Sequence, residues 1–170
     1  MGKNGGVDFK ELEELKKKLE SFEYDEFIES CAKEIAARLL RKVIKRTPTG
    51  VYPAESGKKG GTLKRGWTTS SSGDASHDTK QAMYSNMFGG GQSVSPNNLE
   101  VRREGDAYII TITNPVEYAS YVEYGHRTRN HEGWVKGKFM LTISEREIER
   151  DTPKILENKI KKKLGELFND

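Results

Sequence analysis

The chain has 170 residues, of which 34% are hydrophobic and 32% charged, with a formal net charge of +3 at pH 7. This composition supports one domain with a modest core, and its high charge predicts long helices whose polar faces are solvated or bound to neighbours. The chain has no run of eighteen apolar residues and no N-terminal signal pattern, so we expect a soluble cytoplasmic protein without a membrane span.

The first predicted element is one long helix, or two collinear helices, over residues 8–46. Asp8 begins a capping-box pattern, residues 21–25 interrupt the apolar periodicity, and Thr47-Pro48 ends the helix. The apolar positions recur every three or four residues: Phe9, Leu12, Leu15, Leu19, Phe22, Ile28, Cys31, Ile35, Leu39 and Val43. Cys31 has no partner for a disulfide, so we expect a small buried hydrophobe at this position.

Positive charge is concentrated in the second half of this helix and in the residues after it. Residues 33–66 carry ten Lys or Arg and two acids, whereas residues 1–32 carry five Lys and nine acids. Three interpretations stay open: contact with a nucleic-acid backbone, a solvated helix end, or a subunit interface with the acidic end of a neighbour's helix. The residues that could follow a phosphate backbone are Lys42, Lys45, Arg46, Lys58, Lys59, Lys64, Arg65 and Trp67.

A strand is predicted over residues 63–72, after which residues 73–98 form a long flexible loop without periodicity. A structureless loop of this length is functional, or disordered when it has no partner. Its cluster of adaptable Met and aromatic side chains favours a role in binding a partner. The members of this cluster are Met83, Tyr84, Met87 and Phe88.

Two further strands are predicted at residues 99–103 and 107–113, joined by a hairpin turn at Glu104-Gly105-Asp106. A helix follows over residues 139–150, and Thr152-Pro153 predicts the start of a new helix, because Thr is a good N-cap and Pro suits the first helical position. The predicted class is α+β. An antiparallel sheet of three to four strands packs against the long N-terminal helix and the C-terminal helices.

Residues 114–134 are the best candidate for a docking element. Tyr118, Tyr121 and Tyr124 crowd into about two helical turns, and Gly125 then ends the helix. Residues three apart share a helix face, so at least one of these tyrosines is expected in the core. A polar, basic loop leads from Gly125 to Trp134. The candidate interface residues of this stretch are Tyr118, Tyr121, Tyr124, Arg127, Arg129 and Trp134, and Glu117 and Glu123 are expected to form surface pairs with Arg127 or Arg129.

No pattern in the sequence predicts catalysis, a cofactor or a metal site. The histidines lack the spacing of a zinc site, and Gly57-Lys58-Lys59-Gly60-Gly61-Thr62 has the residues of a phosphate-binding loop without their order. We therefore expect a protein that is not an enzyme and that uses no cofactor.

The run from Tyr118 to Gly125, Tyr-Ala-Ser-Tyr-Val-Glu-Tyr-Gly, resembles the central motif of the neck or tail-completion proteins of long-tailed bacteriophages and prophages. Residues 47–50 and 61–67 resemble an upstream region of that family, with an insertion between them. Residues 137–140 resemble its step into a C-terminal helix. The resemblance covers roughly residues 8–168 apart from the long loop.

This resemblance implies a single neck domain over residues 1–170 that serves as a virion structural protein. It would form a homo-oligomeric, cyclic ring at the head-proximal end of the tail, between the head-tail connector and the tail terminator or tail tube. Assembly would take place in the host cytoplasm, and DNA would pass through the lumen. The candidate lumen-facing or DNA-facing residues are Lys58, Lys59, Lys64 and Arg65. A small basic nucleic-acid-binding module remains the alternative.

Overall fold

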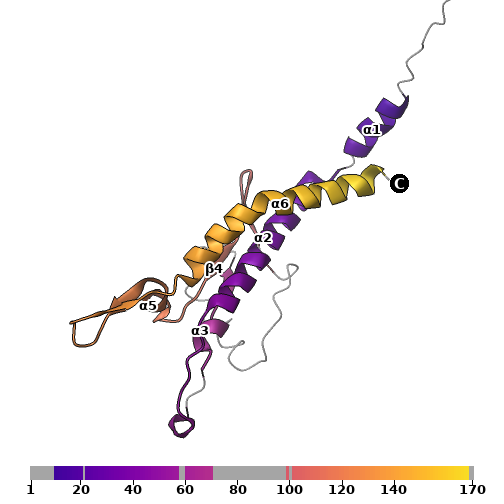
Figure 1. Cartoon of the computed structure of the whole chain (residues 1–170). Helices are drawn as coiled ribbons and strands as arrows, with labels where there is room; N and C mark the ends of the chain where they lie inside the picture. Colours follow the sequence, from indigo (N-terminus) through magenta and orange to yellow (C-terminus); the bar gives the residue numbers. More distant parts are fainter. Residues whose placement is uncertain (1–9, 21, 58–59, 71–98, 100, 169–170) are drawn as a thin grey trace, which may run out of the picture.

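Two long helices that pack side by side form the body of the molecule (Figure 1). The computed structural model describes residues 10–20, 22–57, 60–70, 99 and 101–168. The helices are α2 (Tyr24–Arg46) and α6 (Met140–Phe168), and they run antiparallel, because Arg46 pairs with Glu147 near the start of α6 and Glu34 pairs with Lys159 nearer its end. The shorter elements are arranged around this pair.

The predicted N-terminal helix is divided into two helices. α1 (Lys10–Glu20) ends where the apolar periodicity is interrupted, and α2 begins at Tyr24. The buried side of α2 consists of Cys31, Ala36, Ala37, Leu40 and Val43. The burial of Cys31 is confirmed, and it raises the pKa of the thiol.

The prediction of a new helix at Thr152-Pro153 is wrong, because α6 continues through Pro153. Instead of capping a following helix, the Thr152 hydroxyl donates a hydrogen bond back to the carbonyl of Ile148 at 2.7 Å. Pro153 has no N–H for the carbonyl four residues earlier, and such a loss bends a helix. Figure 1 shows the axis of α6 changing direction partway along its length.

The α+β class is confirmed, but the strands form antiparallel pairs and not a sheet of three or four strands. In the described part of the chain there are three such pairs. β1 (Thr68–Ser70) pairs with β4 (Thr111–Thr113), β2 (Arg102–Glu104) with β3 (Ala107–Ile109), and β5 (Gly125–Arg127) with β6 (Trp134–Lys136). The predicted turn between β2 and β3 is present, with Gly105 at a positive φ of 58°.

The strand predicted over residues 107–113 is divided at Ile110, which packs against Ala36, Ala37 and Leu99. The part before Ile110 is β3, which pairs with β2, and the part after it is β4, which pairs with β1. The strand predicted from residue 63 starts later than expected. Residues 62–65 form the short helix α3 (Thr62–Arg65), and β1 begins only at Thr68.

An ion pair joins the β2–β3 hairpin to the start of α2. The Arg103 guanidinium lies 2.7 Å from an Asp25 carboxylate oxygen and 5.4 Å from the centre of the Tyr108 ring. The hydrogen bond from Arg103 lowers the pKa of Asp25. This contact fixes the hairpin against one end of the helix pair.

The main core lies where α2, α3, α5 (Ala119–Tyr124) and α6 meet. Its buried members are Leu40, Val43, Leu63, Trp67, Val116 and Met140. Trp67 was a candidate for contact with a phosphate backbone, but it is buried, and its indole N–H donates to the Thr47 hydroxyl at 2.7 Å. That hydroxyl donates in turn to the carbonyl of Val43 at 2.7 Å. Thr47 thus ends α2 and provides the hydrogen-bond acceptor for the buried indole N–H of Trp67.

Replacing Thr47 with Val should lower the free energy of unfolding by about 1–3 kcal/mol, because the Trp67 N–H then stays buried without an acceptor. Urea denaturation followed by tryptophan fluorescence measures the change. Thr49→Val, at an exposed position two residues away, is the matched control. Equal stability of the two variants would show that the indole N–H does not depend on Thr47.

Candidate interaction surface

The segments that resemble the phage family lie far apart in the sequence and are in contact in the structure. The Asn114 side-chain amide donates to the carbonyl of Leu63 at 2.8 Å, and its oxygen accepts from the backbone N–H of Val116 at 3.2 Å. A Cβ atom at Gly66 would lie 2.6 Å from that same oxygen, so only glycine permits this close approach. The region around α3 is thereby joined to the segment that leads into α5.

The three tyrosines of α5 all lie on the surface, so the prediction that at least one is in the core is wrong. The exposed fractions are 44% for Tyr118, 58% for Tyr121 and 62% for Tyr124. The smaller side chains of Ala119 and Val122 pack against the core instead, which brings α5 close to the helix pair. The remaining inward position of the helix is occupied by Glu123.

Glu123 is buried and does not form the expected surface pair with Arg127 or Arg129. Its carboxylate accepts hydrogen bonds from the backbone N–H groups of Leu141 at 3.0 Å and Thr142 at 2.9 Å, and from the Thr142 hydroxyl at 2.8 Å. The first N–H groups of a helix have no partner within the helix, and a negative charge is favourable there. Glu123 therefore caps α6 from a different helix.

Backbone contacts reinforce this junction between α5 and α6. The N–H groups of Lys138 and Phe139 donate to the carbonyls of Val122 and Glu123 at 2.8 and 3.0 Å. A Cβ atom at Gly137 would lie 2.3 Å from the Glu123 carbonyl oxygen. Gly125 ends α5 as predicted, with a φ of 90°. The two glycines hold the base of the following hairpin against the start of α6.

The predicted polar loop after Gly125 is a β-hairpin made of β5 and β6. Its turn is closed by a hydrogen bond from the Thr128 N–H to the Gly133 carbonyl at 3.0 Å. The hairpin projects away from the helix pair at one end of the molecule (Figure 1). Sequence reasoning missed these short strands, although the β-prone run Trp134-Val135 was a signal for one of them.

The structure brings most of the candidate interface residues to this end of the molecule. Trp134 and Val135 are 63% and 45% exposed, and Arg127 and Arg129 are also on the surface. We call this region the α5–hairpin face, and it includes both sides of the hairpin, because Trp134 and Val135 are adjacent in β6 and point to opposite sides. It consists of Tyr118, Tyr121, Tyr124, Arg127, Arg129, Trp134 and Val135.

Other predicted site residues do not join this face. Six of the candidates lie outside the described residues: Met83, Tyr84, Met87, Phe88, Lys58 and Lys59. The expected ordering of the loop against a partner also falls outside them. Lys64 is half-buried in α3. Arg65 is exposed, and it donates to the Gly60 carbonyl at 3.3 Å.

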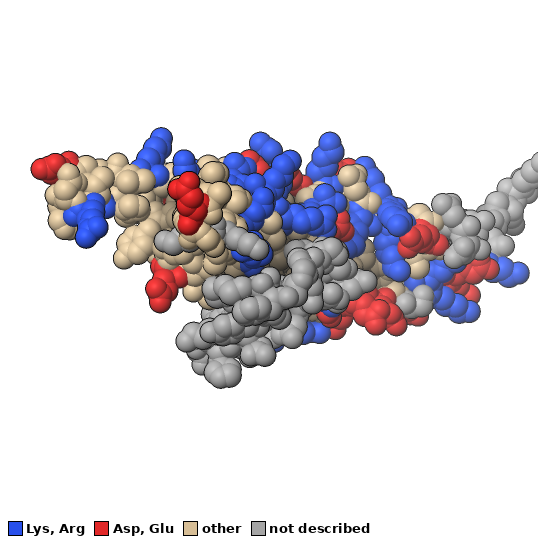
Figure 2. Space-filling view, turned by 90° about the horizontal axis from the view of Figure 1, so that it is seen from below, with Lys and Arg blue, Asp and Glu red and all other residues tan. Residues whose placement is uncertain are grey.

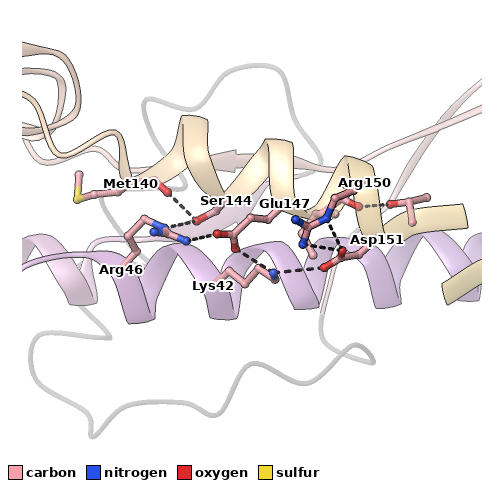
Figure 3. A network of polar contacts seen from close by, with 9 residues as sticks. Lys42, Arg46, Met140, Ser144, Glu147, Arg150 and Asp151 are labelled. Carbon is pink, nitrogen blue, oxygen red and sulfur yellow. Dashed lines mark hydrogen bonds and ion pairs between the residues drawn. The ribbon is translucent and has the colours of Figure 1, made fainter. Parts of the chain in front are cut away.

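Part of the basic block is used inside the chain, in a network of polar contacts between α2 and α6 (Figure 3). The Glu147 carboxylate lies 2.9 Å from the Lys42 ammonium and 2.6 Å from the Arg46 guanidinium. Arg46 also donates to the Ser144 hydroxyl at 3.3 Å, and Lys42 lies 3.5 Å from Asp151. None of the three earlier interpretations included this use of the two cations.

The described residues contain no group of three or more His, Cys, Asp or Glu placed to hold a metal ion. No helix in this part of the chain is long and apolar enough to cross a membrane. The expectations that the protein is not an enzyme and uses no cofactor remain predictions.

These features define a class of α+β domain in which a small core supports exposed aromatic side chains at one end. Residues 10–125 match the family described as "Bacteriophage HK97-gp10, putative tail-component". The match spans more than half of the chain, so the chain belongs to this family, as the resemblance predicted. It is thus a bacteriophage tail component and part of the virion. The comparisons with curated proteins and with solved structures return no match.

Replacing Glu123 with Ala should lower the free energy of unfolding by about 2 kcal/mol or more, because two N–H groups of α6 and the Thr142 hydroxyl lose their acceptor. Glu117→Ala removes an exposed carboxylate from the same segment and should change stability by less than about 0.5 kcal/mol. Chemical denaturation of both variants tests the cap. Similar stabilities would contradict it.

The polar network between α2 and α6 should make stability depend on pH. The hydrogen bonds from Lys42 and then Arg46 lower the pKa of Glu147, and Arg150 lowers the pKa of Asp151. A carboxyl group with a lowered pKa in the folded state stabilises the fold above its ordinary pKa, which is 4.5 for Glu and 3.8 for Asp. This contribution is lost as the pH falls through the folded value.

Thermal unfolding between about pH 7 and about pH 3 should therefore show a fall in Tm below about pH 4.5, and Lys42→Met should make that fall smaller. Lys45→Met, at an exposed position, is the control and should follow the parent protein. If Lys42→Met keeps the full pH dependence, these ion pairs do not contribute to stability.

Proposed function

We propose that this protein completes the neck of a long-tailed phage as a homo-oligomeric ring at the head-proximal end of the tail. Membership of the tail-component family supports a structural role in the tail. In the proposed role the ring joins the head-tail connector to the tail terminator or tail tube. It assembles in the host cytoplasm, and DNA passes through its lumen. The role is geometric and needs neither catalysis nor a cofactor.

The observation that carries this proposal is the exposure of the α5–hairpin face. Tyr121, Tyr124 and Trp134 are each more than half exposed, although they are large and mainly apolar. Tyr, Trp and Arg are the residues that contribute most to binding in protein interfaces. A partner that covers this face would bury the aromatic rings and leave the arginines at the rim.

The position of this face suits a ring. The α5–hairpin face lies at one end of an elongated molecule (Figure 1), where it is accessible to a neighbour that contributes a different surface. Such a heterologous contact closes into a ring when the rotation between neighbours divides a full turn evenly. The junction at Glu123 holds the face in one orientation, which favours a single rotation.

The alternative function, a small basic nucleic-acid-binding module, has lost part of its support. Trp67 is buried in the core, and Lys42 and Arg46 are paired with α6.

The double change Tyr121→Ala and Trp134→Ala should prevent ring formation and leave the monomer folded, because both side chains contact mainly solvent in the isolated chain. Sedimentation velocity and negative-stain electron microscopy of the purified protein measure assembly. Circular dichroism and thermal unfolding check the fold.

Ile160→Ala is the matched control, because this large apolar residue is 44% exposed on α6. The control should assemble like the parent protein. Rings of normal size from the double variant would rule out the α5–hairpin face as the subunit contact. A parent protein that stays monomeric at high concentration, even with its tail partners present, would contradict the ring itself.

A further inference from the structure

A second surface of the molecule has a different character from the α5–hairpin face. α2 and α6 enclose a groove of about 1010 Å³, with Ile148 and Ile155 among its lining residues. Seven Lys or Arg residues and two carboxylates line it, and no aromatic residue of the described chain does. The groove therefore carries a large excess of positive charge.

Both carboxylates of the groove are already paired with cations. Glu34 lies 2.6 Å from Arg38 and 3.1 Å from Lys159, and Asp151 lies 3.0 Å from Arg150 and 3.5 Å from Lys42. The surrounding cations lower the pKa of each carboxyl group, Arg38 contributing most at Glu34 and Arg150 at Asp151. The excess charge of the groove thus has no acidic counterpart within its own lining.

Three cations of the groove are available to a ligand. Arg41 and Lys154 are exposed and form no ion pair with any described residue. Lys162 has a long contact of 3.9 Å with Glu166. Lys154 and Lys162 lie on α6 and Arg41 on α2, so the available charge lies on both sides of the groove.

The positive charge is spread along the groove and not gathered at one point. At a rise of 1.5 Å per residue, the lining residues of α6 from Arg150 to Lys162 span about 18 Å. One strand of duplex DNA presents a phosphate every 3.4 Å along the helix axis, so about five phosphates cover this length. A single small anion would occupy only part of the groove.

We propose that the α2–α6 groove binds the phosphate backbone of nucleic acid, with Arg41, Lys154 and Lys162 as the main contacts. An extended row of cations fits a polyanion of regular spacing. A folded protein partner would more often insert an aromatic or large aliphatic anchor into a pocket. In the role proposed above, the ligand is the DNA that passes through the neck, but phosphate binding itself does not require a ring.

The groove also differs from the lumen residues expected from the sequence. Those were Lys58 and Lys59, which lie outside the described residues, and Lys64 and Arg65, neither of which lines the groove. On the face shown in Figure 2, Lys and Arg side chains are dense over the helical part of the molecule, with Asp and Glu among them, and sparser at the hairpin end. The molecule therefore separates an aromatic surface from a cationic one.

Fluorescence anisotropy with a labelled duplex of mixed sequence tests the proposal on the full chain over a range of salt concentrations. The parent protein should bind weakly and without sequence preference, and its affinity should fall steeply with salt. The double change Arg41→Glu and Lys154→Glu should weaken binding at low salt at least about tenfold. It should also make the negative slope of log affinity against log salt shallower by about two.

A control with the same change of net charge is Lys138→Glu with Arg146→Glu, at two exposed positions outside the groove. It should keep most of the affinity and the slope. Equal losses in both double variants would show that only net charge matters, and would overturn the site. Absence of DNA binding by the parent protein would also overturn it, as would tighter binding of poly-glutamate of equal charge, which would indicate an acidic protein partner.

Sedimentation velocity of the same variants separates this proposal from the ring. Groove variants that lose DNA binding but form normal rings support the groove independently of the α5–hairpin face. A parent protein that binds DNA through the groove but forms no ring would support the groove and contradict the neck role.

Discussion

The carboxylate of Glu123 connects the two halves of this molecule. Glu123 lies in the last turn of α5, and its hydrogen bonds are made to the first N–H groups of α6. The tyrosine-bearing helix and the long C-terminal helix are therefore held in one relative orientation. Gly125 and Gly137 permit the close backbone approach that this contact needs. The hairpin between these glycines is therefore held at its base, although its strands project from the body. A rigid base is useful for a structural contact, because less conformational entropy is lost when a partner binds.

The body to which this junction is attached is stabilised by polar contacts as well as by its core. Only a few side chains of α2 and α6 are fully buried, and Lys42, Arg46 and Glu147 bridge the helices at their edge. Such pairs contribute modestly when partly exposed, but they specify register, because an unpaired charge between the helices would be costly. The two helices thus present their excess of cations in the groove on one side, while the aromatic side chains lie at the end beyond them.

This separation gives the tail component two surfaces with different physical chemistry. The α5–hairpin face offers large rings that gain free energy when a partner removes them from water, and such gains depend little on salt. The groove offers charge, whose attraction for a polyanion weakens as salt rises. In the proposed role, strong binding at the first surface would hold the neighbouring subunits, and weak binding at the second would let DNA pass.

Much of the architecture follows from local chemistry that the sequence displays directly. Periodic apolar residues determined α2, Gly105 fixed a hairpin turn, Gly125 ended α5, and the motif from Tyr118 to Gly125 pointed to the phage family. Tertiary contacts decided the rest. From the sequence, Glu123 is predicted as a surface acid, but the start of α6 lies beside it in the fold and donates hydrogen bonds to it. Trp67 is predicted as a surface residue, but Thr47 accepts the hydrogen bond of its buried indole N–H. Thr152-Pro153 is predicted as a helix start, but α6 continues through it. A residue's neighbours along the chain set its local conformation, but whether a polar group finds a partner inside the fold depends on segments far away in the sequence, which only the folded chain brings together.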